Sequence, residues 1–194
     1  MEPMEETETI IEEWTKVEPP PPPELQHVRV DPKETALLLL DIQNQNCNAE
    51  RRPRCVKRIP HIKKLLSKAR EKGMTVVYSL TRAAEKEDIR EEVTPHNGEP
   101  LVKAGVDKFY QTQLETLLQE NHIKKVIITG TSAEGAVLHT ATGAAARNYE
   151  VIIPVDGISS GEAYAEQYTT WHMVNAPGTR RHTTITKIDW IHIE

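Results

Sequence analysis

The stretch "VIITGTSAEGAVLHTATGAAARNYEVIIPVDGISS", residues 126–160, decides the fold. It begins with a short apolar run of the kind found in buried strands. A tight turn follows at Gly130 and Gly135, then a helix rich in small residues, then a second apolar run. A strand, a helix and a strand in this order favour two parallel strands joined by a helical crossover.

The rest of the chain repeats this alternation. Further strands are predicted at 35–43, 74–80 and 183–191, with a short one before Lys103, beside those at 124–130 and 150–156. Helices are predicted at 58–73, 112–122 and 163–176, while 84–93 is a short helix or an ordered loop. Pro60 fits a first helical turn and Gly73 a helix C-cap. The pattern predicts an α/β fold with a three-layer, mostly parallel sheet, whose ligands bind beyond the carboxyl ends of the strands.

Composition limits the classes of function. Hydrophobic residues make up 38% of the chain and charged residues 27%, as in a soluble globular protein. The apolar stretches are shorter than the roughly 20 residues of a membrane span. The N-terminus lacks the basic-then-apolar order of a signal peptide, so we expect a cytoplasmic protein. Nothing in the charge pattern calls for nucleic acid, and "RRPRCVKR" (51–58) is interpreted as a solvated loop face.

The chain divides into an acidic, proline-rich arm (1–30) and a domain (31–194). The arm carries eight Glu against one Lys and one Arg, and Pro19 to Pro23 favour an extended spacer. Before the prolines, the segment with Ile10, Ile11 and Trp14 is either a short helix that docks on a neighbouring subunit or part of a disordered tail.

Cys47 and Cys55 are the two cysteines, and they could pair across the turn between them. Thiols in a cytosolic chain are more often reduced, which is the expectation here. The eight histidines show no metal-binding spacing, so neither a metal nor a cofactor is predicted.

Two strand ends carry candidate site residues. Asp41 follows four leucines, and it is either a turn former or a general acid or base whose pKa an apolar wall raises. After the strand at 124–130, the amides of 131–136 at a helix N-terminus could hold an oxyanion. Ala136 stands where a nucleophile would be expected.

Three motifs together resemble the isochorismatase-like hydrolase superfamily, which includes nicotinamidases and other cysteine hydrolases. They are "LLLLDIQNQNC" (37–47), "VKAGVDKFYQTQL" (102–114) and "VIITGTSAEGAVLHTATGAA" (126–145). The resemblance implies a six-stranded, mostly parallel, Rossmann-like sheet and a homo-oligomer. It also implies a cis peptide before the nucleophile, at Thr131–Ser132. Its catalytic set falls on Asp41, Lys103 and, in place of the usual cysteine, Ala136.

Other positions are expected to bind substrate. These residues are Gln43, Cys47, Arg82, Phe109, Thr131, Ser132 and Gly135. For Arg82 a surface charge is the competing interpretation.

The leading hypothesis is a hydrolase of a small carbonyl-containing metabolite that cleaves an amide or ureido C–N bond, or a vinyl ether. Ala136 leaves three explanations open: a natural branch that uses Asp41 and water, an engineered Cys→Ala change, or lost chemistry. The last corresponds to the alternative function, a catalytically silent, oligomeric small-molecule-binding protein of the same fold.

Overall fold

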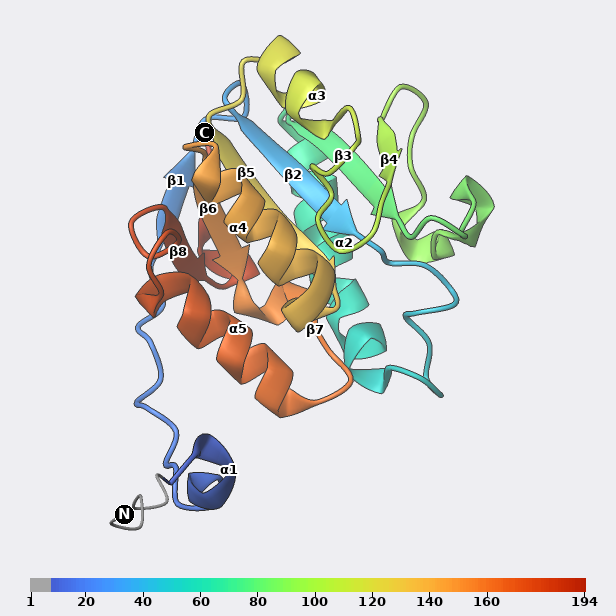
Figure 1. Cartoon of the computed structure of the whole chain (residues 1–194). Coiled ribbons are helices and arrows are strands. Elements are labelled where there is room, and N and C mark those ends of the chain that lie inside the picture. The colour runs from blue at the N-terminus through green and yellow to red at the C-terminus, as the bar shows by residue number, and fades with distance from the viewer. Residues whose placement is uncertain (1–7) are drawn as a thin grey trace, which may run out of the picture.

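The computed structural model describes residues 8–194, and its centre is one parallel sheet (Figure 1). The strands lie in the order β4-β3-β2-β5-β6-β8, and the short β7 pairs with β5. Every pairing among these strands is parallel. Their bounds are β2 Thr35–Leu40, β3 Thr75–Leu80, β4 Leu101–Lys103, β5 Lys125–Thr131, β6 Glu150–Pro154, β7 Ile158–Ser159 and β8 Thr183–Thr186. The predicted α/β sheet is confirmed, with β7 as a short seventh strand.

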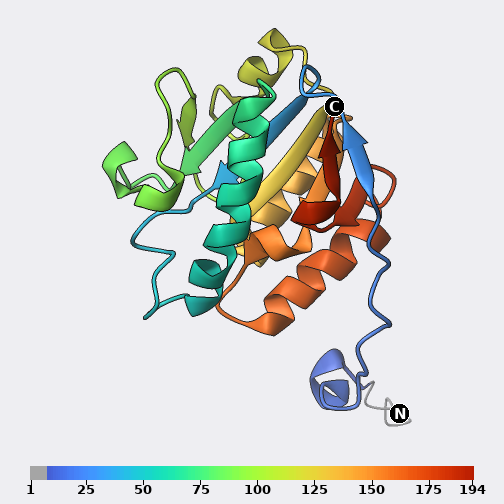
Figure 2. The same cartoon turned by 180° about the vertical axis from the view of Figure 1, so that it is seen from behind.

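Helices cover both faces of the sheet. Helix α2 (Pro53–Glu71) lies alone on one face in Figure 2, and α4 (Leu138–Ala146) and α5 (Ala163–Asn175) lie on the other in Figure 1. Helix α3 (Leu114–Glu120) buries Leu114 and Leu118 in the same apolar cluster as α4. Short 3₁₀ turns occupy Lys86–Asp88, Glu91–Val93, Val155–Gly157 and Ile188–Trp190. The molecule therefore has the three layers that the sequence predicts.

Strand β2 shows why the apolar runs become central strands. All six of its residues are buried. Leu38 and Leu40 belong to the apolar cluster under α4, whereas Leu37 and Leu39 belong to the cluster under α2. Because side chains alternate between the faces of a strand, a strand covered on both faces needs an uninterrupted apolar run.

Two predicted boundaries are wrong. Helix α2 begins at Pro53, so Pro60 lies inside the helix rather than in its first turn. The predicted strand at 183–191 breaks after Thr186, and β9 (Ile191–Ile193) pairs instead with β1 (Val28–Val30) in a separate parallel sheet. Gly73 ends α2 with a φ of 69°, as its C-cap interpretation requires.

The N-terminal arm extends away from the domain in both views (Figures 1 and 2). It carries the short helix α1 (Ile10–Glu13), none of whose residues is buried. The Gln26 amide donates to the Ile185 carbonyl at 3.0 Å and β1 pairs with β9, so the chain joins the fold slightly before the predicted boundary. Between the arm and α5 lies an apolar groove of about 1440 Å³, lined in part by Trp14, Tyr164 and Trp171.

Candidate active site

Asp41 stands directly beyond the carboxyl end of β2. Its φ of 52° turns the chain sharply after Leu40. The Asp41 amide donates to the Ser79 carbonyl at 3.1 Å, and Ser79 Oγ donates to Asp41 Oδ1 at 2.9 Å. The side chain is buried, with 7% of its surface exposed. The backbone and the neighbouring strand β3 thus hold the carboxylate in one orientation.

The cation that meets Asp41 is Lys108. Lys108 Nζ donates to Asp41 Oδ2 at 2.8 Å and to the carbonyls of Ala104 and Leu80 at 3.3 and 3.4 Å. Its side chain is fully buried, and its amide donates to Thr140 Oγ1 on α4 at 3.1 Å. All three ammonium protons therefore have an acceptor, as a buried charge requires.

The expectation that Lys103 meets Asp41 is wrong. Lys103 Nζ instead forms an ion pair with Glu85 at 2.6 Å, near the surface. In β4 the side chain of Val102 is buried and that of Lys103 points outward, because strand residues alternate. The sequence offered one signal for Lys108: it immediately precedes an aromatic residue, Phe109, which the structure shows to be buried.

Burial dominates the acidity of Asp41. Removal from water raises the pKa of this carboxyl, and the charge and hydrogen bond of Lys108 and the hydrogen bond of Ser79 lower it by less. The net result is a pKa above the ordinary value. A carboxyl tuned in this direction can hold a proton closer to neutral pH and is suited to general acid and base catalysis.

The turn with Ala136 follows β5. The Thr131–Ser132 peptide is cis, as the family resemblance implies. A π-helical turn spans Ala133–Val137, and the Gly135 amide donates to the Ser132 carbonyl at 3.1 Å. That amide is therefore engaged within the turn rather than directed at a ligand. Ala136 is buried, with 3% of its surface exposed.

Gly130 brings this turn close to Asp41. Leu40 of β2 pairs with Gly130 of β5, so Asp41 and Thr131 each follow the last paired residue of their strand at the same sheet edge. Gly130 has a φ of 120°, and a Cβ there would lie 2.1 Å from the Leu40 carbonyl oxygen. Only glycine allows the two backbones to approach so closely.

Three further predicted positions, Gln43, Phe109 and Arg82, lie in different surroundings. Gln43 is buried and joined to Thr81 by two hydrogen bonds, of 2.9 and 3.1 Å, so its amide holds the loop after β2 against the end of β3. Phe109 packs in the apolar core, with the guanidinium of Arg147 4.3 Å from its ring centroid. Arg82 is exposed. Thr131 thus lies at the same sheet edge as Asp41, whereas Phe109 belongs to the core and Arg82 to the surface.

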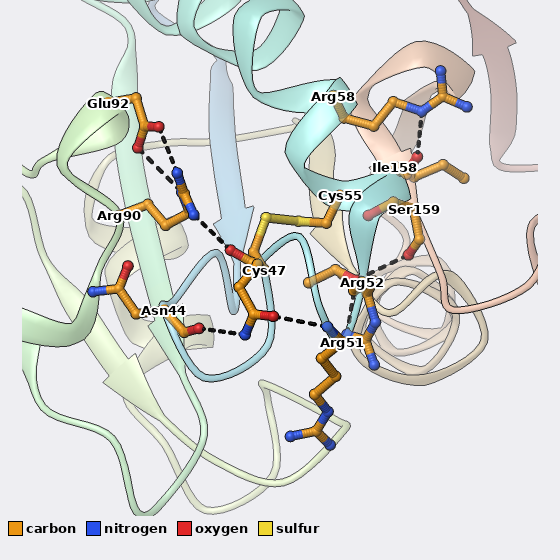
Figure 3. Close-up of a disulfide and its surroundings, with 12 residues drawn as sticks. Asn44, Cys47, Arg51, Arg52, Cys55, Arg58, Arg90, Glu92, Ile158 and Ser159 are labelled. Carbon is orange, nitrogen blue, oxygen red and sulfur yellow. Dashed lines mark hydrogen bonds and ion pairs between the residues drawn. A yellow bond between two sulfur atoms is a disulfide. The ribbon is translucent and has the colours of Figure 1, made fainter.

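Cys47 and Cys55 form a disulfide, so the expectation of reduced thiols is wrong (Figure 3). The bond ties the loop after β2 to the first turn of α2. Arg90 donates to the Cys47 carbonyl at 2.9 Å and pairs with Glu92, as Figure 3 shows. Cys47 is thereby a structural residue of this loop, with a fully buried side chain.

Arg52 is a site residue that the sequence interpretation missed. It precedes α2, and its Nη1 donates to Thr131 Oγ1 at 2.9 Å. The basic run 51–58 was expected to be a solvated face, yet Arg52 is half-buried. Figure 3 shows it close to the disulfide and to Ser159.

Within residues 8–194, no group of three or more His, Cys, Asp or Glu side chains is arranged to hold a metal ion. No helix in that range is long and apolar enough to cross a membrane.

Comparison with known families matches an isochorismatase domain to residues 35–185. The matched range contains Asp41, Lys108 and Ala136. The chain belongs to the isochorismatase family. A relative in the same family, the uncharacterized protein YaaI of Bacillus subtilis, is 28% identical over 162 residues, which cover 73% of this chain and 90% of YaaI.

Other relatives of this isochorismatase-family chain include an N-carbamoylsarcosine amidase from an Arthrobacter species, 32% identical over 91 residues. That alignment covers 46% of this chain and 34% of the amidase. A solved isochorismatase-like hydrolase from Alkaliphilus metalliredigens superimposes with a TM-score of 0.73 at 24% identity, over 80% of this chain and 95% of the other. Membership of this family marks the protein as a hydrolase.

Proposed function

We propose that this hydrolase cleaves a small carbonyl-containing metabolite, with Asp41 transferring the proton and Lys108 stabilising charge beside it. The observation that carries this proposal is the buried Asp41–Lys108 ion pair at the carboxyl edge of the sheet. The raised pKa of Asp41, caused mainly by its burial, supports a role in proton transfer. Bonds of two kinds fit this chemistry, an amide or ureido C–N bond and a vinyl ether.

Ala136 removes the covalent route. Without a thiolate, no thioester forms at this position, so water must attack directly. For a C–N bond, ionised Asp41 takes a proton from the attacking water, and the protonated carboxyl then gives it to the departing nitrogen. For a vinyl ether, protonated Asp41 gives its proton to carbon, and water adds to the resulting cation. The hemiketal then splits into a carbonyl compound and an alcohol, and the proton released by the water returns to Asp41.

The experiment is hydrolysis by the purified protein across a panel of amides, ureido acids and vinyl ethers. We expect turnover of at least one class, and a loss of roughly 10²- to 10⁴-fold in Asp41→Asn. Lys103→Met is the matched control and should keep full activity. Turnover that is equal in wild type and Asp41→Asn would refute the proposed mechanism.

Ala136 also favours a second candidate, a silent binding protein of the same fold. This candidate predicts that no member of the panel is hydrolysed while Asp41→Asn still binds the same compound as wild type. A compound that calorimetric titration shows to bind both proteins equally, and that wild type does not hydrolyse, would favour this candidate over the enzyme.

Assembly and location remain predictions. A homo-oligomer is supported by exposed apolar side chains on the arm, among them Ile10 and Trp14, and light scattering of the full chain tests it. The cytoplasm is the predicted location, although a disulfide is uncommon in that reducing compartment. Cell fractionation is the decisive measurement.

A further inference from the structure

Arg52 approaches the proposed active site from the side opposite to Lys108. It precedes α2 on one face of the sheet, whereas Lys108 is anchored to α4 on the other. The bond from Arg52 Nη1 to Thr131 Oγ1 holds the guanidinium at the end of β5, where Gly130 pairs with Leu40, the residue before Asp41. Arg52 and Asp41 are close enough for the charge of each to shift the pKa of the other.

Arg52 differs from the other arginines of residues 8–194. Six of them have a carboxylate within 4.0 Å: Arg29, Arg54, Arg58, Arg70, Arg90 and Arg147. Four more lack such a partner and are exposed to solvent: Arg51, Arg82, Arg180 and Arg181. In the part of the chain that the structure describes, Arg52 is the arginine that combines partial burial with no carboxylate partner.

The guanidinium also leaves a hydrogen-bond donor unused. Arg52 Nε is buried and has no acceptor among the described residues. Nearby, Thr131 Oγ1 donates to the Ser159 carbonyl at 3.0 Å, and Ser159 Oγ is likewise buried without a partner. Buried polar atoms are nearly always paired in folded proteins, so two unpaired atoms set this cluster apart from the rest of the core.

Two neighbouring arginines share one carboxylate. Glu166 pairs with Arg54 and lies 3.7 Å from Arg58. Arg52 has no carboxylate within 4.0 Å; burial lowers the pKa of its guanidinium, while the nearby charges of Glu134 and Asp41 act to raise it. The planar fork of the guanidinium suits a carboxylate, whose two oxygens can accept parallel hydrogen bonds from it, and its charge of +1 equals that of one carboxylate in magnitude.

We propose that Arg52, held in place by Thr131, binds a carboxylate group of the substrate. This assigns the substrate to the small monocarboxylates, with the bond to be cleaved lying toward Asp41. The inference rests on the proposed function for the identity of the bound molecule as substrate, but the anion site itself is tested by binding alone.

The experiment measures binding in the Asp41→Asn protein, so that no turnover interferes. The probes are N-carbamoylglycine and a series of two- to six-carbon monocarboxylates, each paired with its neutral amide, and inorganic phosphate. Calorimetry and thermal shift report affinity. We expect at least one acid to bind roughly 10-fold or more tightly than its amide, as for a charge-assisted hydrogen bond.

Adding Arg52→Met should abolish this preference, and Arg52→Lys should retain part of it. Arg51→Met is the matched control, because Arg51 is the exposed neighbour, and it should leave the preference unchanged. The proposal is overturned if no acid is preferred, if Arg52→Met keeps the preference, or if phosphate binds as tightly as the best acid.

The two proposals fail separately. Binding that depends on Arg52, in a wild-type protein that hydrolyses nothing, would contradict the proposed function and leave the carboxylate site standing. Hydrolysis that depends on Asp41 but shows no preference for acids over amides would contradict the carboxylate site alone.

Discussion

Replacing Lys108 by methionine tests the site at its centre. The substitution keeps most of the side-chain volume and removes the charge that faces Asp41 Oδ2 at 2.8 Å. The carboxylate would then remain buried with only the Ser79 hydroxyl as a partner. Breaking a buried ion pair from one side costs roughly 3–5 kcal/mol of unfolding free energy. For a chain of this size, each kcal/mol lowers the melting temperature by about 2–4 °C.

The loss should depend on pH. Lys108 lowers the pKa of Asp41 by its charge and its hydrogen bond, so without it the folded-state pKa rises further above the unfolded value. A carboxyl with a raised folded pKa favours folding while it is protonated, and that advantage is lost as the pH rises through the folded pKa. The stability of Lys108→Met should therefore be closest to that of wild type near pH 4–5, not far above the unfolded pKa of about 3.9. It should differ most from wild type at pH 7–8.

The assay is urea unfolding at several pH values, followed by circular dichroism, with two comparison proteins. Lys103→Met removes a surface pair with Glu85 and should change stability by less than about 1 kcal/mol. The double variant Asp41→Asn/Lys108→Met removes both charges and should recover most of the loss, because no buried charge remains unpaired. If Lys103→Met proved the more damaging single change, or the double variant were as unstable as Lys108→Met, the assignment of the ion pair would be wrong.

Three further predictions concern other parts of the molecule. Ala136→Cys should raise amide hydrolysis at least roughly 10-fold by restoring a thiol nucleophile; equal, high turnover in both proteins would show that no thiol is needed. Cys47→Ser should lower the unfolding free energy by about 2.5 kcal/mol, because the disulfide closes a short loop in the unfolded chain, and a reductant should reproduce this change in wild type but not in the variant. Burial raises the pKa of Glu99, but the hydrogen bond from Arg70 and other favourable contacts outweigh it and leave the pKa lowered. Glu99→Gln should therefore destabilise the protein by about 1–3 kcal/mol at neutral pH, and this difference should shrink as the pH falls below about 4.3, which urea unfolding at pH 3.5 and 7 would measure.

The disulfide and Arg52 act on the same loop. Cys47 anchors the loop after β2, and Cys55 anchors the start of α2, with Arg52 between them. Holding both ends restricts the positions that the Arg52 side chain can reach. The preference for an acid over its amide should therefore weaken in a protein whose disulfide is reduced.

Sequence alone was enough for the architecture and for part of the site. The apolar run of β2 and the glycine turn after β5 are local patterns with one favourable outcome, because a strand covered on both faces must be apolar throughout. Asp41 could be located from the same pattern, since it is the first polar residue after that run.

The tertiary structure decided which charges meet. Lys103 and Lys108 are five residues apart, and only the packing of their loop against α4 sends one inward to Asp41 and the other out to Glu85. The disulfide and the position of Arg52 likewise depend on how α2 docks on the sheet. A local pattern determines whether a residue is buried in a strand or a helix, but the pairing of two side chains depends on the path of the chain between them.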